Sequence, residues 1–311
     1  MSNLALKATN PQDTKEIVRA IFSRSEAIFD SFDVTENTKT DYKYRIQQFK
    51  DFVRDHGFNR NSYREYKTYL KERNDLSTSS KNKYLITAKI YLKELHQQGL
   101  PTDITQNTKG FRNDKKHKRD GLNQKEVDTL VEKLRTLPHT PENTRTVAIF
   151  ALLALQGLRQ IEVTRLDVTD IDLSGKRAHI LGKGRDDKEA IDLHPECVAM
   201  LKGYIKANKI KDGALFTSHS NNSKNARLTT RGVRAIVRET LQGLNIEKTT
   251  HGFRHYFTTT LVKSFKGDLL KVSQFTRHKS LEMLQVYFDE VKKREDLPKY
   301  YHAFNSLSFQ A

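Results

Sequence analysis

The sequence has little cysteine and no long apolar segment. Cys197 is the only cysteine among 311 residues, so no disulfide can form within the chain. No run of about 18 apolar residues occurs, which excludes a membrane-spanning helix of ordinary length. The first residues, MSNLALKATNPQDTKE, lack the basic and then apolar layout of a secretory signal peptide. We therefore expect an intracellular, cytoplasmic protein that does not associate with membranes.

Negative charge is scarce relative to positive charge. The chain has 55 lysine and arginine residues against 38 aspartate and glutamate residues, a net charge of +17 at pH 7. This excess indicates an anionic partner, because basic side chains that neutralise phosphates release counterions. Nucleic acid is the leading expectation, and a basic protein without such a partner is the alternative. A chain of 311 residues is about twice the common domain size, which predicts two domains.

Helical periodicity dominates the first third of the sequence. Apolar residues recur near helical spacing in residues 14–32, 40–57, 62–74 and 79–99. The pattern predicts a bundle of four helices in an N-terminal domain, residues 1–112. Its faces carry basic residues among tyrosines, and we keep two interpretations for them, a solvated surface and a DNA-contacting face: Lys43, Arg45, Lys81, Lys83 and Lys89.

The helical pattern stops between residues 101 and 120. This stretch has no hydrophobic period, and we assign residues 113–120 as a basic linker between the domains. A basic linker between two basic domains can cross a DNA backbone, so that the chain would act as a clamp. The basic residues of the linker are Lys115, Lys116, Lys118 and Arg119.

Residues 121–311 predict a second domain that is mainly helical with one small sheet. Three short, alternating and β-branched segments predict antiparallel strands at residues 168–173, 177–184 and 188–194. The predicted fold class is therefore mainly α with a small antiparallel β-sheet, an α+β domain following a helical bundle. Helical patterns occupy residues 123–137, 141–157, 195–208, 229–243, 249–264, 268–276 and 280–288.

Six residues of the second domain are suited to phosphodiester chemistry: Arg159, Lys183, His251, Arg254, His278 and Tyr287. Two guanidinium groups can hold the non-bridging phosphate oxygens and neutralise the charge of a pentacoordinate transition state. A tyrosine hydroxyl can attack phosphorus when a histidine assists removal of its proton. A lysine can return a proton to the departing sugar oxygen. This chemistry requires no metal ion, and the set contains no carboxylate cluster of the kind that metal-dependent nucleases use.

Four motifs, in the order GLRQIEV, LGKG, HGFRHYF and RHKSLEMLQVY, closely resemble those of the tyrosine recombinases, the phage integrase family. The family has Gly-Leu-Arg with a Glu three residues after the Arg, a hairpin lysine, His-x-x-Arg-His, and a His followed nine residues later by a Tyr. The resemblance covers residues 121 to about 290, and the helical bundle looks like the family's core-binding domain. One motif alone would be weak, but four in order and with family-like spacing are specific.

The resemblance implies roles for these residues. Arg159 and Arg254 would clamp the scissile phosphate, and Lys183 would be the general acid. His251 would accept a proton and contact the phosphate. His278 would donate a hydrogen bond to the phosphate.

Tyr287 would be the nucleophile, because among the tyrosines only it has the family's spacing from His278. The tyrosines that could compete for this role are Tyr256, Tyr300 and Tyr301. Glu162 would hold Arg159 in place, or serve only as a structural ion-pair partner. His255 would either contact the phosphate or act as a buried, hydrogen-bonded scaffold.

The sequence departs from the family pattern in two places. Arg277 stands where the family usually has a glycine immediately before the second histidine, which affects the loop around His278. Asp186 and Asp187 occupy hairpin positions that are more often basic or polar. Lys188 is therefore kept as an alternative to the preceding hairpin lysine as general acid.

The mechanism that the resemblance implies is strand exchange through a covalent 3′-phosphotyrosyl intermediate, with no ATP or other cofactor. The family works as a homotetramer on two double-stranded DNA sites and exchanges C-terminal segments between protomers. Here a tail from about residue 291 would dock on a neighbour or fold back on its own domain, with Leu297, Tyr300, Tyr301, Phe304, Leu307 and Phe309 available. A topoisomerase, a non-catalytic DNA-binding regulator and a metal-dependent nuclease are the alternatives.

Overall fold

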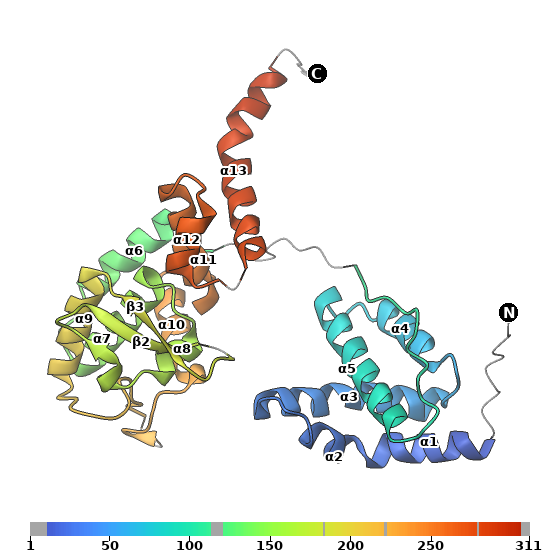
Figure 1. Ribbon diagram of the computed structural model, residues 1–311. Helices are drawn as coiled ribbons and strands as arrows, with labels where there is room; N and C mark the ends of the chain where they lie inside the picture. Colours follow the sequence, from blue (N-terminus) through green and yellow to red (C-terminus); the bar gives the residue numbers. More distant parts are fainter. Residues whose placement is uncertain (1–10, 113–120, 183, 221–222, 279, 306–311) are drawn as a thin grey trace. The chain divides into compact units, whose positions relative to one another are not determined.

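The computed structural model describes residues 11–112, 121–182, 184–220, 223–278 and 280–305 (Figure 1). The chain divides into two compact units, Met1–Asp114 and Lys115–Ala311, and each is described by itself. Helices make up most of the described residues, and the strands among them form one three-stranded antiparallel sheet. The predicted fold class is confirmed.

The first unit is a helical bundle with an aromatic core. Phe29, Phe49 and Tyr66 are completely buried in it. Buried tyrosines bind across the bundle, since the Tyr91 hydroxyl donates to the Ala20 carbonyl at 3.0 Å. The helices in the described part of this unit are α1 (Pro11–Ser23), α2 (Ser25–Asp30), α3 (Glu36–His56), α4 (Ser62–Glu72) and α5 (Thr78–Gln97).

The first predicted helical segment, residues 14–32, is divided at Arg24 into α1 and α2. Arg24 has φ −99° and ψ −6°, and the Ser23 hydroxyl donates to the carbonyl of Arg19 at 2.9 Å. Serine hydroxyls that bond to the preceding turn favour a bend in a helix. The apolar period continues through the bend, which is why the sequence pattern did not show it.

Helix α7 (Pro141–Leu155) lies at the centre of the second unit's core. All residues from Ala148 to Leu153 are buried, which explains why this part of the helix is apolar on every side. It packs against α9 and α11. The other helices in the described part of this unit are α6 (Gln124–Arg135), α8 (Gln160–Arg165), α9 (Pro195–Ala207), α10 (Thr230–Gln242), α11 (Thr250–Ser264), α12 (Leu269–Thr276) and α13 (Leu281–Ala303).

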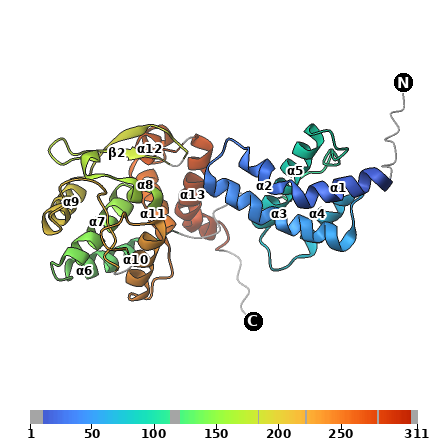
Figure 2. The same cartoon turned by 90° about the horizontal axis from the view of Figure 1, so that it is seen from below.

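The sheet has the strand order β1-β2-β3, with β1 (Ile171–Asp172), β2 (Arg177–Leu181) and β3 (Lys188–Asp192) antiparallel. Ala178 and Ile180 point from one face of β2 into the core. Strand β2 lies beside α8, as Figure 2 shows. Leu181 pairs with Lys188, so the hairpin turn falls between them. Lys183, which comes between them in sequence, lies outside the described residues.

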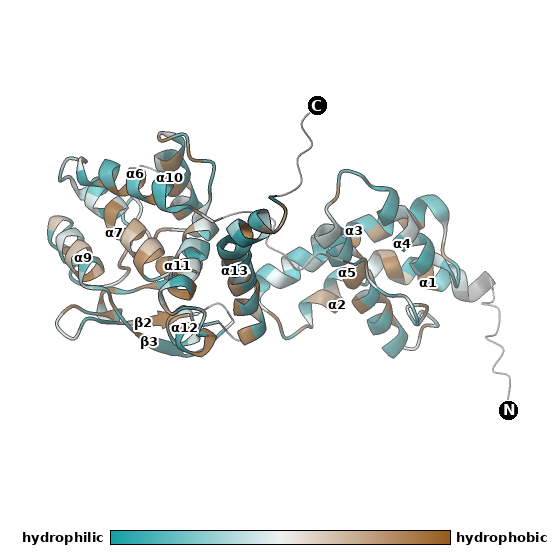
Figure 3. Cartoon of the chain, turned by 90° about the horizontal axis from the view of Figure 1, so that it is seen from above, coloured by the Kyte–Doolittle hydropathy of each residue, from teal (hydrophilic) through white to brown (hydrophobic). Residues whose placement is uncertain are grey.

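Helix α13 extends further than the sequence predicted. The pattern ended at residue 288 and a tail was expected from about residue 291, whereas one helix continues through Pro298 to Ala303. Val291 is buried against Val262 and Leu284, so the expected start of the tail belongs to the core of its own unit. The later part of α13 is largely hydrophilic (Figure 3). In the described part of the chain, none of the helices has the length and apolar character needed to cross a membrane.

Candidate active site

Helix α11 carries Arg254 into the interior of the second unit, where it is 3% exposed. Its guanidinium donates to the carbonyl of Gly157 at 2.7 Å and to that of Thr276 at 2.6 Å. These bonds use two of the five N–H donors of a guanidinium, so the group retains capacity to bind an anion. Burial, together with the positive charge of Arg159, lowers the pKa of Arg254 to about 10. The side chain is still protonated at neutral pH.

Arg159 approaches the same region from the turn after α7. Gly157 has φ +57°, and a Cβ there would collide with the ring of Phe257, so glycine is required at this turn. The Arg159 N–H donates to Glu162 Oε2 at 2.8 Å, and its Nη1 donates to Oε1 at 2.9 Å. One carboxylate therefore caps α8 and orients the guanidinium. Helix α8 was not predicted, because six residues are too few to show a helical period.

Glu162 is 1% exposed and also binds Arg277, whose Nη2 lies 3.1 Å from Oε2. Burial acts to raise the pKa of Glu162, but the charge of Arg277 and the bonds from Arg159 outweigh it and hold that pKa below its ordinary value. Arg277 ends α12 with φ 54° and ψ 39°. This left-handed conformation costs a residue other than glycine roughly 1–2 kcal/mol.

Tyr287 is placed by α13 next to two histidines. Its ring centroid lies 4.9 Å from that of His255 and 5.8 Å from that of His278. The His278 Nδ1 atom is 2.8 Å from the Thr276 hydroxyl. Tyr287 is 3% exposed, and burial raises the pKa of its hydroxyl even though the charges of nearby arginines act in the opposite direction.

His255 is a buried residue held on both sides of its ring. Its Nε2 atom lies 3.3 Å from Glu290 Oε2 on α13, and its Nδ1 lies 3.3 Å from the Thr259 hydroxyl. A Cβ at Gly121 would overlap the same ring, so the chain passes it closely. Of the two interpretations kept for His255, these contacts favour the scaffold.

His251 lies in the first turn of α11 and is exposed. The hydroxyl of the neighbouring Thr250 donates to Gln160 on α8 at 3.3 Å, which joins the start of α11 to the helix that follows Arg159. The start of α11, which carries His251, is therefore joined to the helix that follows Arg159.

Lys188, the alternative general acid, is bound to carboxylates at the sheet. Its ammonium group pairs with the buried Asp170 and lies 3.9 Å from Asp167. Asp167 also accepts from Arg227. Both carboxylates are thus neutralised by basic partners. Within the described ranges, no group of three or more histidine, cysteine, aspartate or glutamate side chains is arranged to hold a metal ion.

The basic residues proposed for DNA contact have mixed surroundings. Lys43 pairs with Asp30 at 2.8 Å, Arg45 pairs with Asp41 at 2.7 Å, and the Lys81 ammonium donates to a backbone carbonyl at 2.8 Å. Lys83 is exposed and Lys89 is half-buried. The linker residues lie outside the described residues: Lys115, Lys116, Lys118 and Arg119.

Helix α10 carries a basic surface that was not predicted from the sequence. Arg231, Arg234 and Arg238 are exposed along this helix. Val233 and Val237 point from the same helix into the core. The signal was present as arginines at intervals of three and four residues opposite an apolar stripe.

The part of the chain that contains the four sequence motifs matches a known protein family. The model of the phage integrase family matches residues 121–294, more than half of the chain. The chain belongs to the phage integrase family. This confirms the resemblance to the tyrosine recombinases.

Among relatives of this integrase-family chain is the tyrosine recombinase XerC of Actinobacillus pleuropneumoniae serotype 7. The two are 27% identical over 167 residues, which cover 52% of this chain and 53% of the relative. The match thus spans about half the length of that relative.

Two solved structures share the fold. The XerH site-specific recombinase bound to palindromic difH substrate, in a post-cleavage complex, superposes with a TM-score of 0.70 at 21% identity, covering 84% of this chain and 79% of the other. The lambda integrase tetramer bound to a Holliday junction superposes with a TM-score of 0.67 at 16% identity, covering 91% and 82%. At these identities the likeness establishes the fold.

Proposed function

We propose that this chain is a site-specific DNA recombinase that cleaves and rejoins DNA through a 3′-phosphotyrosyl intermediate. The observation that carries the proposal is the gathering of two arginines, a histidine and a tyrosine from distant segments: Arg159, Arg254, His278 and Tyr287. A buried positive site beside a tyrosine hydroxyl suits attack on a phosphodiester. Membership of the integrase family supports the same reaction.

In the proposed reaction the Tyr287 oxygen forms a bond to phosphorus while the bond from phosphorus to the 5′ oxygen breaks. His251 accepts the tyrosine proton, and Lys183 gives a proton to the departing 5′ oxygen. Arg159 and Arg254 neutralise the charge that develops on the non-bridging oxygens. The released 5′-hydroxyl of a partner strand then reverses the step. The phosphodiester energy is retained in the tyrosyl ester, so no ATP or other cofactor is needed.

We assign the proton-donating role to Lys183 rather than Lys188 in this scheme. The ammonium group of Lys188 is already paired with the buried Asp170, and turning it toward DNA would leave that carboxylate without its partner. The place of Lys183 in the motif LGKG matches the hairpin lysine of the family pattern.

Supercoiled and linear DNA from the chain's own genetic neighbourhood tests the function directly. The protein is incubated with this DNA in the presence of a chelator, and covalent protein–DNA adducts are trapped by detergent and mapped. We expect adducts at a defined sequence and exchange between two copies of it. Relaxation that needs no second site would favour the topoisomerase, and tight site-specific binding without any adduct would favour the regulator.

We propose that the first unit, a core-binding domain of residues 1–112, and the linker of residues 113–120 embrace DNA together with the catalytic unit. Exposed basic residues are present on each unit: Lys83 on the first, and Arg231, Arg234 and Arg238 on α10 of the second. The net charge of +17 is consistent with a large phosphate contribution to affinity.

Neutralising α10 is expected to weaken DNA binding in a salt-dependent way. The double variant Arg231→Gln, Arg238→Gln should lower affinity and reduce the slope of log affinity against log salt by roughly 1–2, because each phosphate contact contributes about one. Binding isotherms at several salt concentrations measure this slope. Lys202→Gln, an exposed lysine on α9, is the matched control and should leave the slope unchanged. An equal slope in all three proteins would place α10 away from DNA.

We further propose assembly as a tetramer in which the end of α13 docks on a second copy. Tyr300, Tyr301 and Phe304 are 60%, 60% and 53% exposed, an unusual density of aromatic surface at one helix end. Leu307 and Phe309 lie outside the described residues. The lambda integrase relative forms a tetramer on DNA, which supports the same state here.

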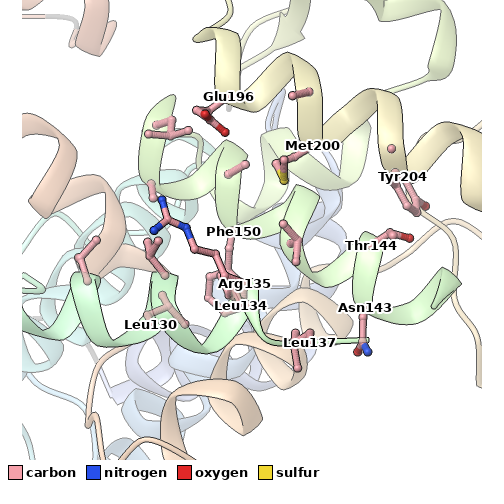
Figure 4. A pocket seen from close by; sticks show the side chains of 18 of the residues that line it. Leu130, Leu134, Arg135, Leu137, Asn143, Thr144, Phe150, Glu196, Met200 and Tyr204 are labelled. Carbon is pink, nitrogen blue, oxygen red and sulfur yellow. The ribbon is translucent and has the colours of Figure 1, made fainter. Parts of the chain in front are cut away.

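A candidate acceptor for this helix end is an apolar cavity of about 720 Å³ in the second unit. It lies between α6, α7 and α9, and Figure 4 shows Leu134, Phe150 and Met200 directed into it. Polar residues, among them Arg135 and Glu196, stand at its edge (Figure 4). An apolar floor with a polar border suits an amphipathic helix.

Removing the aromatic surface is expected to weaken assembly without weakening DNA binding by single protomers. The double variant Tyr301→Ser, Phe304→Ser should shift assembly on DNA to at least about tenfold higher protein concentration, as expected for lost apolar anchors. Light scattering of the protein–DNA complexes measures the change. Met200→Glu in the cavity should have the same effect, and Tyr44→Ser, another exposed tyrosine, should have none. If the double variant Tyr301→Ser, Phe304→Ser and the variant Met200→Glu both assembled on DNA at the same protein concentration as the parent, docking of the end of α13 in this cavity would be refuted.

A further inference from the structure

The turn between α12 and α13 contains an unexpected residue, Arg277. Its backbone is left-handed, and its N–H donates to the Ser273 carbonyl at 3.1 Å, which closes the end of α12. Glycine adopts this conformation without steric cost and is the usual residue at such helix ends. The family pattern also usually has glycine here. The arginine side chain therefore has to offset an unfavourable backbone.

That side chain is buried and points at a carboxylate. The side chain of Arg277 is 6% exposed, and its Nη2 lies 3.1 Å from Oε2 of Glu162. The same carboxylate accepts two hydrogen bonds from Arg159, one from its backbone and one from its guanidinium. One buried carboxylate thus joins a guanidinium of the turn to a guanidinium of the proposed phosphate clamp.

The residues on either side of Arg277 contact two more members of the site. The Thr276 carbonyl accepts from Arg254 at 2.6 Å, and the Thr276 hydroxyl lies 2.8 Å from Nδ1 of His278. A shift of this turn would therefore move the groups that hold Arg254 and His278. Anchoring the turn to α8 would fix all of these groups relative to one another.

We infer that Arg277 is a positioning residue that locks the His278 turn onto Glu162 and thereby orients Arg159. It acts through Glu162 and does not itself touch the phosphate. The inference rests on the proposed function, since the roles of Arg159 and His278 belong to that reaction. It also gives Glu162 a specific role, because its carboxylate connects Arg277 in the turn to the guanidinium of Arg159.

A double-mutant cycle between Arg277 and Glu162 tests this inference. The parent, Arg277→Gly, Glu162→Gln and the double variant are compared on a nicked DNA duplex whose sequence is taken from the parent's mapped adduct. Each protein is measured for single-turnover cleavage rate, DNA affinity and thermal unfolding. We expect each single variant to cleave about 10–100-fold more slowly, the loss typical of an indirect supporting contact. DNA affinity should change less than about threefold.

The double variant decides whether the two residues act together. If Arg277 acts through Glu162, the double variant will be no slower than the slower single variant, because the second substitution removes nothing further. Multiplied losses would overturn the inference, as would a parent-like rate for Arg277→Gly. A parent that forms no adduct would instead refute the proposed function, so the two failures are distinguishable.

Two further variants separate positioning from folding. Lys266, in the turn before α12, also has a positive φ, of 50°, and Lys266→Gly relieves the same kind of backbone conformation without touching Glu162. It should raise thermal stability and leave the cleavage rate unchanged. Arg277→Lys keeps the charge but lacks the planar fork, so its rate should lie between those of parent and glycine variant. If Arg277→Gly is unfolded at the assay temperature, Arg277→Lys replaces it as the test. A cleavage rate of Arg277→Lys equal to that of the parent would then overturn the inference.

Discussion

Tyr287→Phe is expected to abolish covalent capture of DNA while leaving DNA binding nearly intact. The substitution removes the one oxygen that the proposed reaction joins to phosphorus, and loss of a nucleophile costs more than about 10⁴-fold in rate. The phenyl ring keeps the packing of this buried residue against His255, Leu284 and Val291. Trapping of the adduct by detergent and a parallel binding isotherm measure the two quantities.

Tyr256→Phe is the matched control for this variant. Its hydroxyl donates to Gln124 at 2.9 Å, so the control also removes a hydrogen-bonded tyrosine hydroxyl from the same unit. We expect it to form adducts at close to the parent rate. Adduct formation by Tyr287→Phe would show that another nucleophile operates, with Tyr300 and Tyr301 the next candidates.

The buried position of Tyr287 sets a condition on this chemistry. Burial raises the pKa of its hydroxyl, so at neutral pH the group is protonated before DNA is bound. A neutral phenol is a poor nucleophile, and the proton has to pass to an acceptor as the new bond forms. Because an incoming phosphate must reach a residue that is only 3% exposed, we expect the surroundings of α13 to rearrange when DNA binds.

Most helices of the second unit and the strands β2 and β3 were predictable because their periods are strong, whereas the strand predicted at residues 168–173 is a 3-10 helix, Val168–Asp170, followed by the two-residue β1. The alternation at Ala178 and Ile180 and the apolar run of α7 arise directly from burial, so the sequence contains the same information. Helix α8 gave no such signal, since it has only six residues. The true end of α13 was hidden by Pro298 and by the charged residues before it, which resemble a break in a helix.

The sequence predicted which residues form the candidate site, but it did not predict the contacts between them. Motif order and spacing gave Arg159, Arg254, His278 and Tyr287, and the structure brings all four into one region. The bond between Glu162 and the residue before His278 joins positions 115 apart in sequence, and a left-handed φ leaves no local pattern. Such a contact depends on tertiary packing alone.

Strand register bears on the choice of hairpin lysine. The sequence favoured Lys183 and kept Lys188 as the alternative, and the pairing of β2 with β3 shows the surroundings of Lys188. Leu181 opposite Lys188 brings the latter to Asp170. The ion pair of Lys188 with Asp170 supports the proposal that Lys183 is the general acid.

Arg254→Lys is expected to lower the cleavage rate by about 10²–10³-fold with DNA affinity changed only a few-fold. A lysine keeps a positive charge but cannot bind the carbonyls of Gly157 and Thr276 together and still present donors to the phosphate. Removing one donor aimed at a developing charge costs about 2.7–4 kcal/mol in other enzymes, which corresponds to that range of rate. Single-turnover cleavage and binding isotherms on the same duplex measure the difference.

The matched control has to distinguish a loss of catalysis from a loss of protein stability, since changing a buried arginine can cause either. Arg145 on α7 also donates from its guanidinium to a backbone carbonyl, that of Thr217, at 2.9 Å. Arg145→Lys should therefore lower thermal stability to a similar degree while the cleavage rate stays close to that of the parent. Equal losses of cleavage in both variants would show that the rate follows stability. Equal losses of cleavage and binding in Arg254→Lys would make Arg254 an ordinary contact to the DNA backbone, because an interaction specific to the transition state cannot appear in the ground-state affinity.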